Sequence, residues 1–146
     1  MYRSSDGGGD SGVIESDVLF DTSAWWEYLF ETPMGARLRA RFVEGDRTRI
    51  HTSAISLGEI GARLSEQGTE GQIGMVCGAI RRMSRIWDIT ADIAQDAGPA
   101  RSRLRRDTKD ASLADAIVLI TAQRAGALIV SSDRAFRGVP GTIADA

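Results

Sequence analysis

The chain has 146 residues, of which 42% are hydrophobic and 26% charged, and its formal net charge at pH 7 is −2. These values are typical of one globular domain with a single core, and they exclude a broadly basic nucleic-acid coat. The single cysteine, Cys77, excludes an internal disulfide, and the longest apolar run, at 116–120, is too short to cross a bilayer, so we expect a cytoplasmic protein without a membrane partner.

Strands and helices alternate along the chain after a polar N-terminal segment. Residues 1–16 are rich in Gly, Ser and Asp and lack periodicity, which predicts a flexible tail before a single domain at 17–146. In chain order, the apolar spacing predicts a strand at 17–20, helices at 23–32 and 34–45, a strand at 47–51, helices at 53–68 and 72–85, a strand at 86–89, helices at 90–107 and 112–125, a strand at 127–132 and an edge strand at 142–145. We expect Gly45 to cap the second helix and Gly98-Pro99 to interrupt the fifth.

This alternation indicates the fold class. Strands separated by helices of about 10–15 residues are typical of βαβ units, whose strands run parallel. We therefore expect an α/β fold with a mostly parallel central sheet of four to five strands, flanked by helices. In such sheets, functional sites form beyond the carboxyl ends of the strands.

Four acidic residues are expected at that edge of the sheet. Asp21 ends the first strand, and Asp133 directly follows the strand at 127–132. Glu59 lies in the early turns of a helix that follows a strand almost at once, and Asp115 lies in the first turn of its helix. A right-handed crossover into strand 127–132 places the start of the Asp115 helix on the same side. The topology therefore predicts that four carboxylates converge.

Each acid also has a purely structural interpretation. The segments SLGE (56–59) and SLAD (112–115) both fit the capping box, and Asp21 and Asp133 fit helix N-caps. One shared purpose explains four acids at one edge better than four separate caps. Clustered carboxylates repel one another and raise their own pKa values unless a cation lies between them. Hard oxygen ligands of this kind select Mg²⁺ or Mn²⁺.

Four segments carry a resemblance to a known family: VLFDTSAWW, ISLGEIGARL, SLADAIVLITAQRAG and IVSSDRAF. Over residues 17–143 the chain resembles the PIN-domain nucleases, and especially the VapC-type toxins of bacterial and archaeal toxin–antitoxin pairs. The residues that match the acidic quartet of this family are Asp21, Glu59, Asp115 and Asp133. Supporting residues also match: Ser131 stands at the hydroxyl position two places before the last acid, and Thr22 and Ser23 stand at the small polar positions after the first.

The resemblance implies a PIN-like fold and a Mg²⁺-dependent endoribonuclease, the toxin of a type II toxin–antitoxin pair, with Mn²⁺ as a substitute metal. It implies that Asp21 and Asp115 bind the metal ion, that Asp133 completes its surroundings, and that Glu59 orients or deprotonates the attacking water. The implied partners are an RNA substrate, an antitoxin protein and a second copy of the chain in a homodimer. His51 is the only histidine, which excludes a two-histidine mechanism, and we expect it to bond the backbone.

Two further features have two interpretations each. A basic cluster either binds RNA phosphates near the metal or forms a solvated helix face. Its members are Arg101, Arg103, Arg105 and Arg106, together with Arg81, Arg82 and Arg85. Trp25 and Trp26 are neighbours on a helix, so they cannot both face inward, and one of them is free to serve a partner surface. Three other classes of function stay open: a PIN-fold RNA-processing nuclease without an antitoxin, a non-catalytic PIN-like interaction module, and an α/β phosphatase or phosphotransferase.

Overall fold

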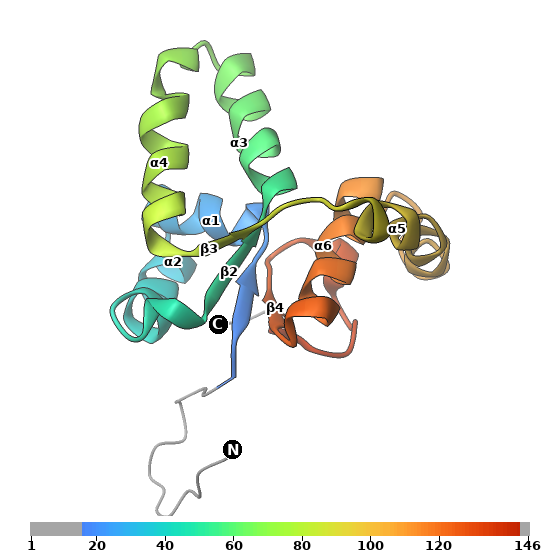
Figure 1. Ribbon diagram of the computed structural model, residues 1–146. Coiled ribbons are helices and arrows are strands. Elements are labelled where there is room, and N and C mark those ends of the chain that lie inside the picture. Colours follow the sequence, from blue (N-terminus) through green and yellow to red (C-terminus); the bar gives the residue numbers. More distant parts are fainter. Residues whose placement is uncertain (1–15, 144–146) are drawn as a thin grey trace, which may run out of the picture.

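The computed structural model of the protein describes residues 16–143 (Figure 1). The tail predicted at residues 1–16 therefore lies, apart from Ser16, outside the described residues, as do the last three positions of the predicted domain. Among the residues that are described, no helix is both long and apolar enough to span a bilayer.

A five-stranded parallel sheet forms the centre of the fold, as the alternation of strands and helices predicts. Its strands are β1 (Val18–Phe20), β2 (Ile50–Ser53), β3 (Arg85–Trp87), β4 (Leu128–Val130) and β5 (Thr142–Ile143), in the order β3-β2-β1-β4-β5. All the pairings are parallel. The chain moves outward from β1 to one side through β2 and β3 and then crosses to the other side at β4. The switch point between β1 and β4 is where such sheets form ligand sites.

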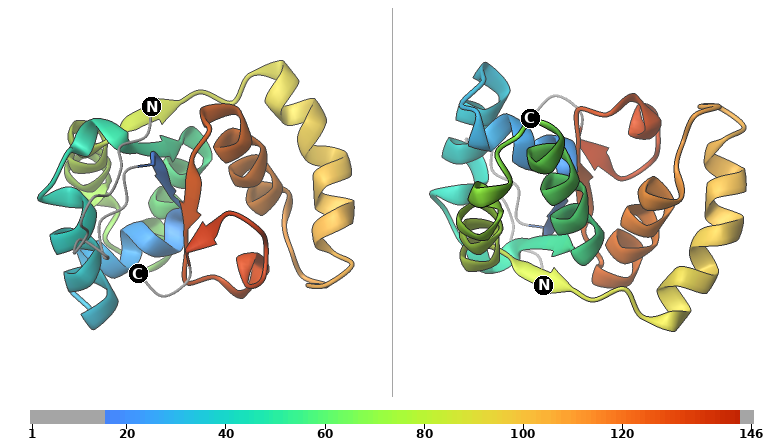
Figure 2. Two further views of the ribbon diagram at one scale, coloured as in Figure 1. Left: turned by 90° about the horizontal axis from the view of Figure 1, so that it is seen from below. Right: turned by 90° about the horizontal axis from the view of Figure 1, so that it is seen from above.

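Six α-helices cover the two faces of the sheet (Figures 1 and 2). They are α1 (Thr22–Leu29), α2 (Pro33–Leu38), α3 (Ala54–Glu66), α4 (Ile73–Met83), α5 (Ala91–Leu104) and α6 (Leu113–Ala125). On the central strand, Leu19 faces a core built with α5 and α6, whereas Val18 and Phe20 face a core built with α1 to α4. This alternation follows from the two-residue period of a strand, and it explains why β1 is apolar at every position.

The helix pair α3 and α4 forms an antiparallel hairpin that projects beyond the sheet, and α5 lies outside α6 (Figures 1 and 2). Helices α1 and α2 approach so closely that a Cβ on Gly35 would lie 2.0 Å from the carbonyl oxygen of Glu27. Only glycine fits at that position. The missing side chain therefore lets α2 pack directly against the last turn of α1.

The predicted interruption of the fifth helix is wrong, since α5 runs without a break through Pro99. Proline lacks the N–H that would bond the carbonyl of Gln95. Gly98 and Pro99 are exposed, whereas Ala97 and Ala100 are fully buried. The unpaired carbonyl therefore faces solvent, and the buried alanines keep the helix packed against α6.

Two boundaries before β2 also differ from the prediction. The second helix continues as a π-helical segment at Arg39–Val43 and ends on Glu44, not on Gly45. The strand expected at 47–51 begins only at Ile50, because residues 47–49 form a 3₁₀ turn. The carboxylate of Asp46 accepts hydrogen bonds from the backbone N–H and the hydroxyl of Thr48, and this local bonding competes with a strand.

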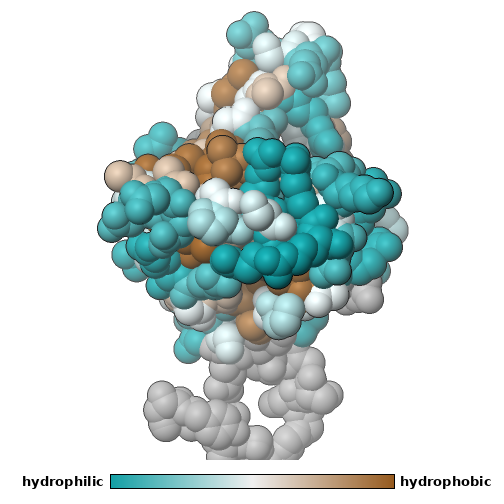
Figure 3. Space-filling model, turned by 90° about the vertical axis from the view of Figure 1, so that its right-hand side faces the viewer, coloured by the Kyte–Doolittle hydropathy of each residue, from teal (hydrophilic) through white to brown (hydrophobic). Residues whose placement is uncertain are grey.

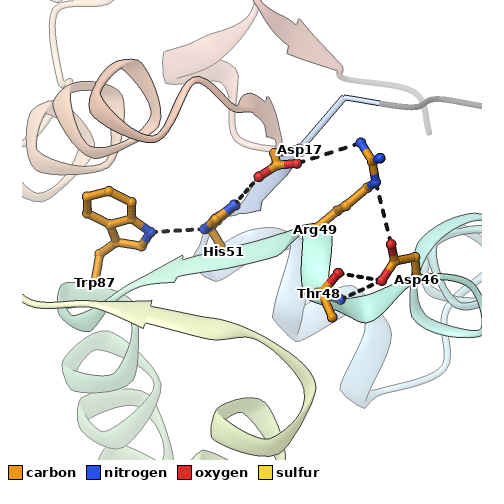
Figure 4. A network of polar contacts seen from close by, with 6 residues as sticks. All are labelled: Asp17, Asp46, Thr48, Arg49, His51 and Trp87. Carbon is orange, nitrogen blue, oxygen red and sulfur yellow. Dashed lines mark hydrogen bonds and ion pairs between the residues drawn. The ribbon is translucent and has the colours of Figure 1, made fainter. Parts of the chain in front are cut away.

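A polar network ties the amino end of β1 to β2 and β3 (Figure 4). His51 is buried, and its Nδ1 accepts a hydrogen bond from the indole N–H of Trp87 over 2.9 Å. Because an indole only donates, the proton of the neutral imidazole lies on Nε2, which donates to Asp17 over 2.7 Å. Arg49 continues the network with ion pairs to Asp17 and Asp46. The expected backbone bond of His51 is therefore wrong, because two side chains, those of Asp17 and Trp87, hold the ring.

Candidate active site

The four acids of the quartet come from four different elements and line one pocket of about 500 Å³, here called the acid pocket. Asp21 directly follows β1, and Asp133 comes three residues after the end of β4. Asp115 lies in the first turn of α6, and Glu59 lies in the second turn of α3. The parallel sheet thus brings the four predicted site residues together at its carboxyl edge, at the β1–β4 switch point.

Three of these acids also cap helices, so the helix-capping interpretation and the interpretation as a shared site are compatible. Asp21 caps α1 through Ala24 N, and Asp133 caps the 3₁₀ turn at 134–136. Asp115 forms a capping box with Ser112, in which each side chain accepts from the other residue's backbone N–H. Glu59 caps nothing, because Ser53 and not Ser56 begins α3. Capping fixes each carboxylate at the edge, and it does not use all of its oxygen lone pairs.

Asp21 lies at the closed end of the pocket and is only 4% exposed. Its carboxylate accepts hydrogen bonds from Ser131 Oγ at 2.5 Å, Ser23 Oγ at 2.6 Å and Ala24 N at 2.9 Å. Burial raises the pKa of Asp21 to about 6; these hydrogen bonds lower it, and the charge of Asp133 raises it further. Ser131 also accepts a hydrogen bond from the backbone N–H of Asp133, so one hydroxyl joins both acids.

The pKa values of Glu59 and Asp115 are also raised by burial and by neighbouring negative charges. Burial raises the pKa of Glu59, and the hydrogen bond from Thr22 Oγ1 at 2.5 Å lowers it. The charges of Asp115 and Asp133 raise it again, and the charge of Arg63 lowers it. Burial likewise raises the pKa of Asp115, the backbone N–H of Ser112 lowers it, and Asp133 raises it. The charge of Asp133 thus contributes to the raised pKa of each of the three other acids, as expected for carboxylates that line one pocket.

Several residues that line the pocket were not predicted from the sequence. They are Trp26, Glu27, Ala62, Arg63, Glu66, Val118, Ser132 and Phe136. A signal for part of this set was present on α3, where positions 59, 62, 63 and 66 have the spacing of one helix face. Within the part of the chain that the structure describes, the lining holds six carboxylates and a single cationic side chain, that of Arg63.

The predicted basic cluster lies elsewhere. Arg101, Arg103, Arg105 and Arg106 do not line the acid pocket. They sit on α5 and just after it, on a side of the molecule whose surface is mainly hydrophilic (Figure 3). The Nε of Arg105 donates to the carbonyl of Ala111 over 2.8 Å, which braces the loop before α6. The structure thus does not bring these arginines to the acids, and their binding of RNA stays a prediction.

The adjacent tryptophans face different ways, as the helical period predicts. Trp25 is fully buried, and its indole N–H donates to Thr52 Oγ1 over 3.0 Å. Trp26 is half-buried at the edge of the acid pocket.

The donor set of the pocket fits a hard divalent cation. The hydrogen bonds made within residues 16–143 occupy only one carboxylate oxygen each in Glu59, Asp115 and Asp133, and the charge of these groups is not compensated by an ion pair there. In the same part of the chain, no three His, Cys, Asp or Glu side chains lie close enough to enclose a metal ion on their own. Mg²⁺ usually binds one or two carboxylates and retains several waters. The carboxylate oxygens of the pocket therefore fit Mg²⁺, and the expected ligands Asp21, Asp115 and Asp133 stay a prediction.

Solved structures share this fold at low sequence identity. A toxin–antitoxin complex from Klebsiella pneumoniae matches with a TM-score of 0.62 and 22% identity, covering 89% of this chain and 98% of that chain. The sarcin–ricin loop cleaving toxin VapC20 of Mycobacterium tuberculosis matches with a TM-score of 0.66 and 22% identity, covering 88% and 98%. VapBC2 of Rickettsia felis, bound to a DNA fragment from its promoter, matches with a TM-score of 0.65 and 17% identity, covering 86% and 95%.

The comparison with curated proteins gives no match. The family model of the PIN domain, in contrast, matches residues 18–141, from the first residue of β1 to the last residue before β5. This match covers most of the chain and contains all four acids of the pocket. The chain therefore belongs to the PIN-domain family.

Proposed function

We propose that this protein is a Mg²⁺-dependent endoribonuclease and the toxin of a toxin–antitoxin pair. The observation that carries the proposal is the acid pocket, in which four carboxylates, two of them after β1 and β4 and two on α3 and α6, line one space. Burial, together with neighbouring negative charge, raises the pKa values of Asp21, Glu59 and Asp115 there. Such an arrangement is unfavourable for folding unless a bound cation compensates it, and it is therefore a mark of function.

The residues of the pocket have distinct roles in this proposal. Asp21 and Asp115 would hold Mg²⁺, with Asp133 beside them. When bound, the ion would supply positive charge for the reacting phosphodiester and lower the pKa of a water molecule. Ser131 and Ser23 keep Asp21 in one orientation through their hydrogen bonds.

Glu59 orients and deprotonates the attacking water. Thr22 holds Oε1 of Glu59, and Oε2 accepts no hydrogen bond from residues 16–143, so it is available to water. A carboxylate with a raised pKa is a stronger base than an ordinary glutamate, which suits this role. A histidine base is not available, because the only histidine is locked between Trp87 and Asp17.

The toxin assignment rests on the likeness to VapC and VapBC structures, all below 25% identity. Nothing in the described residues favours the interaction module, since the acids needed for chemistry are all present in the pocket. As a toxin, the chain would act on RNA in the cytoplasm and would be held inactive by an antitoxin protein.

The nuclease activity is tested by incubating the purified protein with labelled single-stranded RNA in Mg²⁺, in Mn²⁺ and in EDTA. Asp115→Asn keeps an oxygen that can accept from Ser112 N, so it should fold normally and lose cleavage. Asp107→Asn removes an equal charge from an exposed position outside the pocket and should cleave like the wild type. Cleavage in EDTA, or full activity of Asp115→Asn, would refute the proposal.

The toxin role needs a separate test in cells. Induced expression of the chain should arrest growth, the Asp115→Asn variant should not, and co-expression of a short neighbouring reading frame should restore growth. Active enzyme without growth arrest would instead support an RNA-processing nuclease.

A further inference from the structure

Among residues 16–143, the only cationic side chain that lines the acid pocket makes no ion pair with an acid. Arg63 lies on α3, one turn after Glu59 and just before Glu66, in a pocket lined by six carboxylates. Among residues 16–143, no carboxylate lies within ion-pair distance of its guanidinium, and none of the hydrogen bonds found there involves it. An arginine surrounded by acids would ordinarily bind one of them, so its position needs another explanation.

Trp26 supplies that explanation. The guanidinium carbon of Arg63 lies 4.4 Å from the centroid of the Trp26 ring, within the range of a strong cation–π contact. The guanidinium carries five N–H donors, and a contact with a ring face leaves donors for another partner. The indole thus holds the guanidinium at the pocket without a direct ion pair among residues 16–143, although its charge lowers the pKa of Glu59.

We propose that Arg63, held by Trp26, binds a phosphate of a single-stranded RNA next to the phosphate that is cleaved. This inference rests on the proposed nuclease function and adds a positioning residue to it. An RNA strand that enters a pocket lined by six carboxylates is repelled on most sides, so a cation beside the pocket is needed to hold the neighbouring backbone.

An aromatic surface next to Arg63 favours RNA over a protein carboxylate as the partner. The Trp26 and Phe30 rings lie 4.7 Å apart, and Phe30 is 55% exposed. Positive charge beside exposed aromatic rings is the usual composition of sites for single-stranded nucleic acids, because bases stack where phosphates are held. A protein segment complementary to six carboxylates would itself be basic, and it would repel Arg63.

The test measures RNA affinity by fluorescence anisotropy with a short labelled single-stranded RNA, over a series of salt concentrations. All variants are made on the Asp115→Asn background, so that the RNA stays intact, which a gel confirms. Arg63→Ala should bind about tenfold more weakly, and the slope of log affinity against log salt should become shallower by about 0.7, the value for one phosphate of a single strand. Arg63→Lys should keep the slope and recover part of the affinity.

Two controls separate positioning from structure. Arg41→Ala removes another exposed arginine stacked on an aromatic ring, 5.3 Å from the centroid of Phe42 and outside the pocket, and it should bind like the background. Trp26→Leu should weaken binding through release of Arg63, Trp26→Phe should restore it, and the Trp26→Leu, Arg63→Ala pair should bind no more weakly than Arg63→Ala alone.

Unchanged affinity and salt slope in Arg63→Ala would overturn the inference, and this is also the result expected if Arg63 binds a carboxylate of a partner protein. Because binding is measured without turnover, the test gives a clear answer even in the case that the wild-type protein cleaves no RNA. In that case the proposed function fails, while the Arg63 result still supports or refutes an RNA-binding role.

Discussion

Replacing Asp21 by asparagine should stabilise the metal-free protein at neutral pH. The carboxylate is 4% exposed, and burial raises its pKa from an ordinary 3.8 to about 6. Because the folded state favours the protonated form, the folded protein binds more protons than the unfolded chain between about pH 4 and pH 6. The free energy of unfolding therefore falls as pH rises through that window. At about 1.4 kcal/mol per pKa unit, this one group costs about 3 kcal/mol at pH 7.5.

Asparagine removes that cost while keeping the local hydrogen bonds. Its amide oxygen can accept from Ser23 and Ala24 N as the carboxylate does, and its NH₂ group can donate to Ser131, whose hydroxyl also accepts. In EDTA, Asp21→Asn should thus be more stable than the wild type at pH 7.5 by up to about 3 kcal/mol, and the difference should vanish near pH 4.

Urea denaturation followed by tryptophan fluorescence measures this at a series of pH values. Asp107→Asn, which changes an exposed acid outside the pocket, should follow the wild-type profile. Added Mn²⁺ should stabilise the wild type and leave Asp21→Asn unchanged, because only a folded protein with the complete site binds it. Equal or lower stability of Asp21→Asn at pH 7.5, with an unchanged pH profile, would show that Asp21 does not carry an uncompensated buried charge.

Three further substitutions test individual contacts. Glu59→Gln can still accept from Thr22, so it should fold normally and lose a factor of about 10²–10⁴ in RNA cleavage rate; a near-normal rate would exclude Glu59 as the base. Ser131→Ala removes a donor to Asp21 and an acceptor of a backbone N–H, so urea titration should show a loss of about 1–3 kcal/mol; unchanged stability would contradict that bonding. Trp87→Phe leaves Nδ1 of the buried histidine without its donor and should cost about 1 kcal/mol of stability with unchanged cleavage; a loss of activity would mean that this remote network reaches the site.

The features that the sequence predicted well depend on patterns along the chain. The apolar run at 18–20 and the alternation of strands with helices predict the parallel sheet, because such strands must be covered on both faces. The parallel topology in turn places Asp21, Glu59, Asp115 and Asp133 at one edge, so the sequence alone groups residues that lie far apart along the chain.

The features that were missed or wrong depend on contacts that no local pattern encodes. Trp26 meets Arg63 only because α1 and α3 pack side by side, so neither residue could be assigned to the pocket from its own segment. His51 lies on β2, whereas its partners Asp17 and Trp87 lie just before β1 and in β3, the two neighbouring strands of the sheet. The break expected at Pro99 failed because the direction of its missing bond, toward solvent, is set by tertiary packing.

The central claim, that folding gathers these carboxylates around a divalent cation, is tested most directly by a crystal soaked in Mn²⁺ and measured at a wavelength where manganese scatters anomalously. We predict one strong anomalous peak in the acid pocket, in direct contact with Asp21 or Asp115 and lost in Asp21→Asn crystals. A pocket with ordered acidic side chains and no anomalous peak at saturating Mn²⁺ would contradict the account.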